Sequence, residues 1–176
     1  MSKEYYQMGW TLDEAYQEDY FCSRDNQRYF IKKNTTPMIA TLSAEGIVPR
    51  LRWTKRISNG DVLIAQDFEH GRTLNTEDMT DKRIPEILRK VHGSSKLKKI
   101  MKAQGYAEET AARSLCNLKS IIADELRKNS NIVDALNYLE KCLPDDDVEY
   151  TPCHTDLHKD NWLLSDQGKL FLVDWE

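Results

Sequence analysis

The residues best suited to chemistry gather near the C-terminal end of the sequence, between Cys153 and Asn161 and again at Asp174. Asp156 lies five residues before Asn161, and Asp174 follows a segment rich in apolar residues. Carboxylate and amide oxygens are the ligands that Mg²⁺ prefers, and a carboxylate can also orient a hydroxyl group for attack on phosphorus. This pattern predicts a site for phosphoryl transfer, with one base and two metal ligands.

A hairpin is needed to bring these side chains together. The segments 162–164 and 169–173 have the apolar content of strands, and the polar residues 165–168 between them are typical of a turn. Because a hairpin brings its two ends side by side, Asn161 and Asp174 are expected to lie at the same edge.

The N-terminal part is predicted to form an antiparallel sheet with one short helix. Strand candidates lie at 28–32, 51–53 and 62–65. The pair Asn59-Gly60 predicts a hairpin turn, because both residues tolerate positive φ. Thr36 as N-cap and Pro37 in the first helical position predict a short helix that ends at Gly46.

The period of the apolar residues becomes helical beyond about residue 73. Three helices are predicted, within 84–91, 115–126 and 132–143, the last ended by Pro144 and the acidic run 145–147. The fold class is therefore expected to be α+β. Two domains are predicted, residues 1–70 with the sheet and 71–176 with the helices, catalytic loop and second hairpin.

Composition excludes several classes of protein. The net charge of −4, the pI near 5.6 and the scattered basic residues argue against nucleic acid as a partner. No apolar stretch approaches the ~20 residues that a membrane span needs, and no secretion signal is apparent, so a cytoplasmic protein without a membrane partner is expected. The four cysteines lie far apart in the sequence, which does not suggest a disulfide framework.

The spacing His154-x-Asp156-x4-Asn161, followed by Asp174, resembles the catalytic and metal motifs of aminoglycoside and choline phosphotransferases. The resemblance implies a two-lobed protein-kinase-like fold and the cofactors ATP and Mg²⁺. It implies that Asp156 is the catalytic base, that His154 supports the catalytic loop, and that Asn161 and Asp174 bind Mg²⁺. Family members continue beyond the position of Glu176 with helices that form the acceptor pocket, so the resemblance also implies an incomplete C-lobe.

Further segments resemble a bacterial subgroup of ribonucleoside kinases that regulate the cell cycle. They are residues 43–49, 53–56, 71–72 and 161–164. This resemblance implies a small-molecule hydroxyl acceptor, with a ribonucleoside first and amino alcohols or aminosugars as alternatives. The sequence predicts no oligomeric state.

Nucleotide-binding residues are expected in the N-terminal part, also by resemblance. Lys32 ends an apolar strand and would bind the phosphates, whereas Lys33 should point to the opposite face. The helix glutamate that pairs with this lysine would be Glu45. Gln66 and Phe68 belong to the segment in the place of the hinge, whose backbone usually reads the adenine edge.

Two observations leave other interpretations open. Kinases of this class cover the phosphates with a glycine-rich hairpin, but no glycine lies between Gly9 and Gly46, and residues 12–21 are acidic and bulky. A non-catalytic kinase-like scaffold that binds a partner protein, such as a cell-division protein, is therefore the alternative function. A zinc site is a further alternative, with the donor types found at Cys153, His154, Asp156 and His158.

Overall fold

The computed structural model describes residues 11–16, 19–24, 27–144 and 149–175. The chain divides into two compact units. We call the first, Met1–Met101 with Pro152–Glu176, the sheet unit, and the second, Lys102–Thr151, the helical hairpin. The sheet unit includes residues on both sides of the boundary predicted near residue 70.

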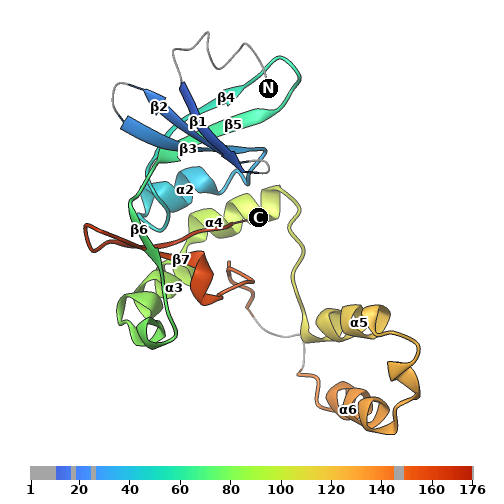
Figure 1. Cartoon of the computed structure of the whole chain (residues 1–176). Coiled ribbons are helices and arrows are strands. Elements are labelled where there is room, and N and C mark those ends of the chain that lie inside the picture. Colours follow the sequence, from blue (N-terminus) through green and yellow to red (C-terminus); the bar gives the residue numbers. More distant parts are fainter. Residues whose placement is uncertain (1–10, 17–18, 25–26, 145–148, 176) are drawn as a thin grey trace. The chain divides into compact units, whose positions relative to one another are not determined.

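A five-stranded antiparallel sheet opens the sheet unit (Figure 1), in the order β1-β2-β3-β5-β4. Its strands are β1 Thr11–Tyr16, β2 Asp19–Arg24, β3 Gln27–Lys33, β4 Leu51–Arg56 and β5 Val62–Asp67. The predicted Asn59-Gly60 turn is confirmed, because Arg56 pairs with Val62 and Gly60 has φ 93°. The β1–β2 hairpin was not predicted, and its turn at 17–18 lies outside the described residues.

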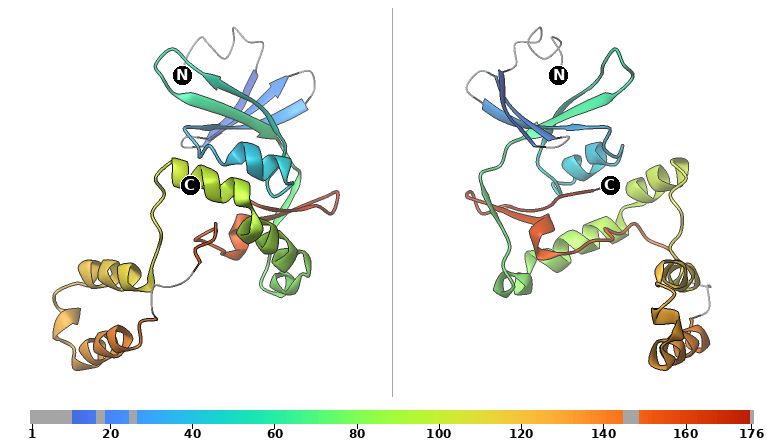
Figure 2. Two further views of the ribbon diagram at one scale, coloured as in Figure 1. Left: turned by 180° about the vertical axis from the view of Figure 1, so that it is seen from behind. Right: turned by 45° about the vertical axis from the view of Figure 1, so that its right-hand side comes forward.

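The short helix α2, Ile39–Ala44, begins two residues later than predicted. Thr36 and Pro37 instead form a tighter turn, in which the Thr36 hydroxyl accepts from the Met38 amide at 3.3 Å and the Thr36 carbonyl accepts from the Ile39 amide at 3.3 Å. Gly46, with φ 70°, follows the helix as predicted. In both views of Figure 2, α2 lies between the five-stranded sheet and helix α4, Ser95–Ala103.

A second, three-stranded sheet has the order β6-β7-β8. Its strands are β6 Gly71–Thr73, β7 Trp162–Ser165 and β8 Leu170–Leu172. The β7–β8 hairpin is the one predicted from the sequence, whereas β6 was not predicted. Gly71 lies opposite Ser165, and a Cβ atom at Gly71 would clash with the carbonyl oxygen of Leu164. Glycine is thus required for the close approach of β6 to β7.

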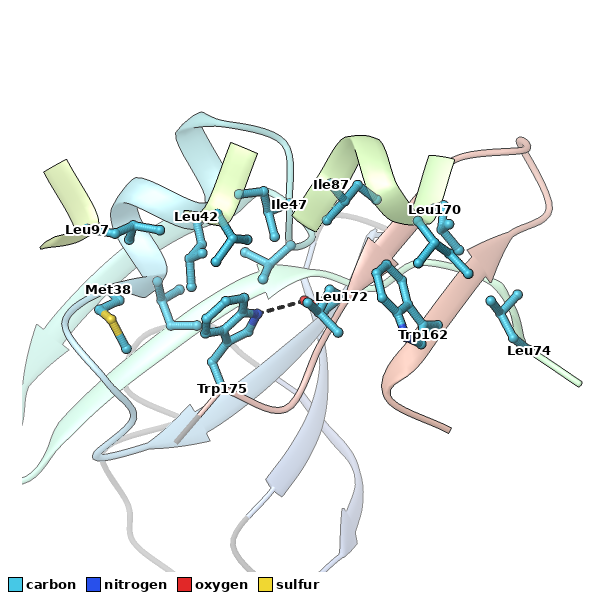
Figure 3. Packing of buried hydrophobic residues seen from close by; sticks show 14 of the residues in the cluster. Met38, Leu42, Ile47, Leu74, Ile87, Leu97, Trp162, Leu170, Leu172 and Trp175 are labelled. Carbon is cyan, nitrogen blue, oxygen red and sulfur yellow. Dashed lines mark hydrogen bonds between the residues drawn. The ribbon is translucent and has the colours of Figure 1, made fainter. Parts of the chain in front are cut away.

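One apolar core joins the second sheet to α2 and to helices α3, Arg83–Gly93, and α4. Figure 3 shows its side chains as a continuous row from Leu97 on α4 to Leu74 after β6. The predicted helix at 84–91 is confirmed by α3, but α4 was missed. Trp175 lies in the middle of this row, and its indole N–H donates to the Leu172 carbonyl at 2.8 Å.

The helical hairpin contains α5, Ala111–Ile121, the 3₁₀ helix η2, Leu126–Lys128, and α6, Ser130–Lys141. The prediction of one helix within 115–126 is wrong at its end, because Ile122 is extended with ψ 125° and Leu126 starts η2. Side-chain oxygens of Thr110 and Asn129 cap α5 and α6. Among the described residues, no helix has the length and apolar content to cross a membrane.

Candidate functional site

The loop that contains Asp156 and Asn161 is anchored by His154, which is 8% exposed. Its Nε2–H donates to the Val173 carbonyl at 2.9 Å, while its Nδ1 accepts from the Asp156 amide at 3.1 Å. The backbone amide can only donate, so this network assigns the proton to Nε2. The ring also stands edge-on to Trp175 with 4.6 Å between centroids. With both nitrogens engaged, His154 offers no lone pair for the alternative zinc site.

Asp156 and Asn161 form a hydrogen-bonded pair across the loop. The Asn161 amide nitrogen donates to Asp156 Oδ2 at 3.0 Å and to the Asp156 carbonyl at 3.1 Å. The second carboxylate oxygen, Oδ1, accepts from the His158 amide at 3.2 Å. Because the Asn161 nitrogen is used twice within the loop, Oδ1 of Asn161 is the atom left to bind a cation.

Asp174 lies two residues after the end of β8 and has the left-handed φ of 62°. Non-glycine residues rarely adopt this conformation, and asparagine and aspartate tolerate it best. The preceding Val173 is held by its amide, which donates to the Asn161 carbonyl at 2.8 Å. Asp174 Oδ1 lies 3.2 Å from Lys32 Nζ. A locally strained backbone thus aims a carboxylate at the lysine of β3.

Lys32, Asn161 and Asp174 line one pocket of about 480 Å³, all of it within the sheet unit. That volume is typical of small-molecule sites, which span roughly 300–1,000 Å³. The structure therefore brings the predicted phosphate-binding lysine and both predicted metal ligands to the same cavity. Asp156 is joined to them through its hydrogen bond with Asn161.

Aromatic side chains line the same pocket, two of which sequence reasoning missed. Phe21 lies 5.4 Å from Phe30 and stands edge-on to Phe68, also at 5.4 Å between ring centroids. Phe68 was predicted, but Phe21 and Phe30 were not. Strand alternation contained the signal for Phe30, because it lies two residues before Lys32 and so shares its face of β3.

The two predicted hinge residues both line the pocket. Gln66 is buried, and its amide nitrogen donates to the Pro49 carbonyl at 2.8 Å. The Phe68 backbone amide donates to the Arg28 carbonyl at 3.3 Å, and the Arg28 guanidinium lies 4.5 Å from the Phe68 ring centroid. The side chain of Gln66 and the amide of Phe68 are thus already engaged within the protein.

Glu45 is the predicted site residue that the structure places elsewhere. It follows the last residue of α2, and its Oε1 accepts from the Ser94 hydroxyl at 3.0 Å at the junction of α3 and α4. The ion pair found for Lys32 among the described residues is the one with Asp174. The expected pairing of Lys32 with a helix glutamate is thus replaced by a pairing with a predicted metal ligand.

Asp160 adds a carboxylate to the pocket that was not predicted. A hydrogen bond from Lys159 at 2.7 Å, with His158 also nearby, holds the pKa of Asp160 below its ordinary value. The described residues contain no group of three or more His, Cys, Asp or Glu able to hold a metal ion by themselves. The oxygens of Asn161 and Asp174 suit Mg²⁺, which usually takes few protein ligands and completes its shell with water and phosphate oxygens.

Comparisons with known proteins all find phosphotransferases and kinases of small molecules. A model described as a phosphotransferase enzyme family matches residues 18–176. Among solved structures, choline kinase LicA from Streptococcus pneumoniae is 23% identical with a TM-score of 0.58, and the match covers 94% of this chain and 61% of that one. An AMP-bound spectinomycin phosphotransferase is 20% identical with a TM-score of 0.61, covering 94% and 63%.

A third similar structure is a macrolide 2′-phosphotransferase from Brachybacterium faecium, which is 18% identical with a TM-score of 0.57, covering 98% of this chain and 69% of that one. These similarities show a shared protein-kinase-like fold, with the antiparallel N-terminal sheet and the helices that follow it. The chain spans about three fifths of the length of the choline kinase and the spectinomycin phosphotransferase.

Proposed function

Because this chain belongs to the phosphotransferase enzyme family, we propose that it transfers the γ-phosphate of ATP to a hydroxyl group of a small molecule. The observation that carries the proposal is the meeting of Lys32, Asn161 and Asp174 in one pocket, with Asp156 bonded to Asn161. These residues come from distant parts of the sequence. Their types are those that phosphoryl transfer requires.

Lys32 and the two metal ligands would act on the nucleotide. Mg²⁺, when bound, neutralises charge on the phosphate oxygens. Asn161 through Oδ1 and Asp174 through its carboxylate would hold the ion. Lys32, now 3.2 Å from Asp174, would turn its ammonium group to the phosphate oxygens. The three phenylalanines offer an apolar, aromatic wall for a nucleotide base.

Asp156 would act on the acceptor. Its two carboxylate oxygens are held by the Asn161 side chain and the His158 amide, and its own amide is held by His154. A carboxylate with so little freedom can orient the attacking hydroxyl in line with the phosphorus and take its proton. His154 would then be a positioning residue, since it connects the loop to Val173 beside Asp174.

The acceptor is proposed to be a ribonucleoside, with amino alcohols and aminosugars as the alternatives. Support comes from the resemblance at residues 43–49, 53–56, 71–72 and 161–164. The names of the similar solved proteins indicate choline, spectinomycin and macrolides as their substrates, which all carry hydroxyl groups. Incubating the protein with labelled ATP and each of these acceptors in turn distinguishes the alternatives, because the true acceptor is the one that becomes phosphorylated.

Thermal unfolding with and without a non-hydrolysable ATP analogue and Mg²⁺ tests the proposal. We expect a rise in midpoint that EDTA removes, since a ligand at about 100 times its Kd stabilises by about 2.7 kcal/mol. Asparagine tolerates positive φ as aspartate does, so Asp174→Asn should keep the backbone conformation. This variant should show little of the rise in midpoint, because it lacks the carboxylate. Asp166→Asn, on the exposed β7–β8 turn, is the matched control and should keep it. Asp156→Asn should keep the rise but abolish product formation.

A non-catalytic scaffold is the second candidate, and the β1–β2 hairpin favours it. By the resemblance this hairpin would take the place of the phosphate-covering loop, yet residues 12–21 contain no glycine. Its function would be to bind a partner such as a cell-division protein. If neither Mg²⁺ with nucleotide nor nucleotide alone shifts the unfolding midpoint, the scaffold replaces the enzyme as the better proposal.

A further inference from the structure

A second groove shares Val48 and residues 67–69 with the nucleotide pocket. Its volume is about 1270 Å³, and its walls come from α2, β4, α3 and the β7–β8 turn, all in the sheet unit. Pockets for small ligands rarely exceed roughly 1,000 Å³. The groove is therefore better matched to an extended segment than to a metabolite.

Positive charge dominates the groove although the whole chain carries a net charge of −4. Its basic residues are Arg28, Arg50, Arg52, Arg83, Lys90 and Lys169, against the acidic Asp67, Glu69 and Glu86. The Arg52 guanidinium already neutralises Asp67 through two hydrogen bonds of 2.5 and 2.8 Å. A local excess of positive charge on an acidic protein attracts an anionic partner to this surface.

Three of the cations are available for a partner. Arg50, Lys90 and Lys169 are exposed, and the described part of the chain supplies no carboxylate to any of them. They come from three different places in the sequence, before β4, on α3 and before β8. A single extended ligand lying in the groove would therefore meet cations on several sides.

The floor of the groove is apolar, which narrows the class of partner. Val48, Ile87 and Phe171 line it and are 3%, 7% and 6% exposed. Glu69 and Glu86 line it as well, and they would repel a uniformly charged phosphate backbone. A peptide can place carboxylates against the cations and apolar side chains against the floor, so its pattern fits both features.

We propose that this groove binds an acidic, partly apolar segment of a partner protein, with Arg50, Lys90 and Lys169 contacting its carboxylates. The proposal does not depend on the phosphotransferase activity. Exposed cations of this kind chiefly raise the association rate and make binding sensitive to salt.

Fluorescence anisotropy with a labelled peptide of alternating glutamate and leucine tests this inference. We expect binding that weakens as salt is raised. The triple variant Arg50→Glu, Lys90→Glu, Lys169→Glu should bind about tenfold more weakly or worse. The control Arg89→Glu, Lys99→Glu, Lys102→Glu makes the same change in net charge with exposed residues outside the groove. It should remain within about twofold of the unmodified protein.

Three outcomes would overturn the proposal. The first is no binding of the acidic peptide, and the second is an equal loss in both triple variants, which would indicate a response to net charge alone. The third is tighter binding of a single-stranded RNA through the same three residues, which would make the groove a nucleic-acid site. If the charge reversals prevent folding, as judged by circular dichroism, Arg50→Gln, Lys90→Gln, Lys169→Gln applies the same test.

Discussion

The sheet unit and the helical hairpin differ most in what they bury. Elements throughout the sheet unit contribute fully buried side chains, such as Leu42 of α2 and Leu172 of β8. In α5 and α6, Leu115 is the buried apolar residue, while Ile121 is 78% and Tyr138 67% exposed. The hairpin helices therefore depend on caps and local contacts, whereas the sheet unit has a core of its own.

This difference has a functional side, because every proposed catalytic and binding residue lies in the sheet unit. The hydrogen bonds that position the site residues join backbone segments, and the apolar core fixes these segments relative to one another. One example is the Leu172 amide, which donates to the Ile47 carbonyl at 2.9 Å just before Asp174. Damage to the core should therefore reach the site, and damage to the hairpin should not.

The largest effect is expected from removing the same side chain in the two units. Leu172→Ala empties a position that is 0% exposed and should lower the free energy of unfolding by about 3 kcal/mol. Leu139→Ala on α6, where the leucine is 46% exposed, should cost less than about 1 kcal/mol. Urea denaturation followed by circular dichroism measures both. Equal losses would show that the hairpin is as well packed as the sheet unit.

A smaller effect is expected from two glycines within the sheet unit. Gly71→Ala should cost about 2 kcal/mol, because the added Cβ meets the Leu164 backbone and must separate β6 from β7. Gly93→Ala is the control, since a Cβ there meets nothing within 4 Å at the end of α3, and it should be neutral or slightly stabilising. Thermal unfolding compares them. A tolerated Gly71→Ala would mean that the second sheet does not need this close approach.

Much of the fold was predictable where the signal was local. Turn residues identified both the β4–β5 and the β7–β8 hairpins, and the helical period identified α3 and α6. The missed elements depend on distant partners instead. Strand β6 is three residues long and exists because it pairs with β7, about ninety positions later in the chain. No local pattern in Gly71–Thr73 distinguishes it from a loop.

The candidate site shows the same division. The loop around Asp156 and Asn161 has a recognisable spacing, and the structure places Asn161 and Asp174 in one pocket as that spacing predicted. Their roles stay predictions. The orientation of Glu45 could not be read from the sequence, because Ser94, which contacts it at 3.0 Å, lies 49 residues away. The participation of Phe21 likewise depends on the pairing of β2 with β3.

The smallest expected effect concerns the ion pair between Asp81 and Arg83 at the start of α3. Hydrogen bonds from the Arg83 side chain, and then from its amide, lower the pKa of Asp81 to about 2, and Arg83 also donates to the Gly168 carbonyl at 2.5 Å. Because the folded pKa lies below the unfolded value of about 3.9, the contribution is complete above pH 4 and is lost as the pH falls toward about 2. The Asp81 side chain is 24% exposed, so we expect the ion pair to contribute only about 1 kcal/mol to the free energy of unfolding. Asp81→Asn should thus lower the free energy of urea unfolding at pH 7 and make little difference near pH 2.

The comparison is the pair Lys119–Glu140 in the helical hairpin, whose side chains are 38% and 59% exposed. Glu140→Gln should change the free energy of unfolding by less than about 0.5 kcal/mol. A larger loss from Glu140→Gln than from Asp81→Asn would show that the hairpin is held by its charges more firmly than its caps and exposure indicate.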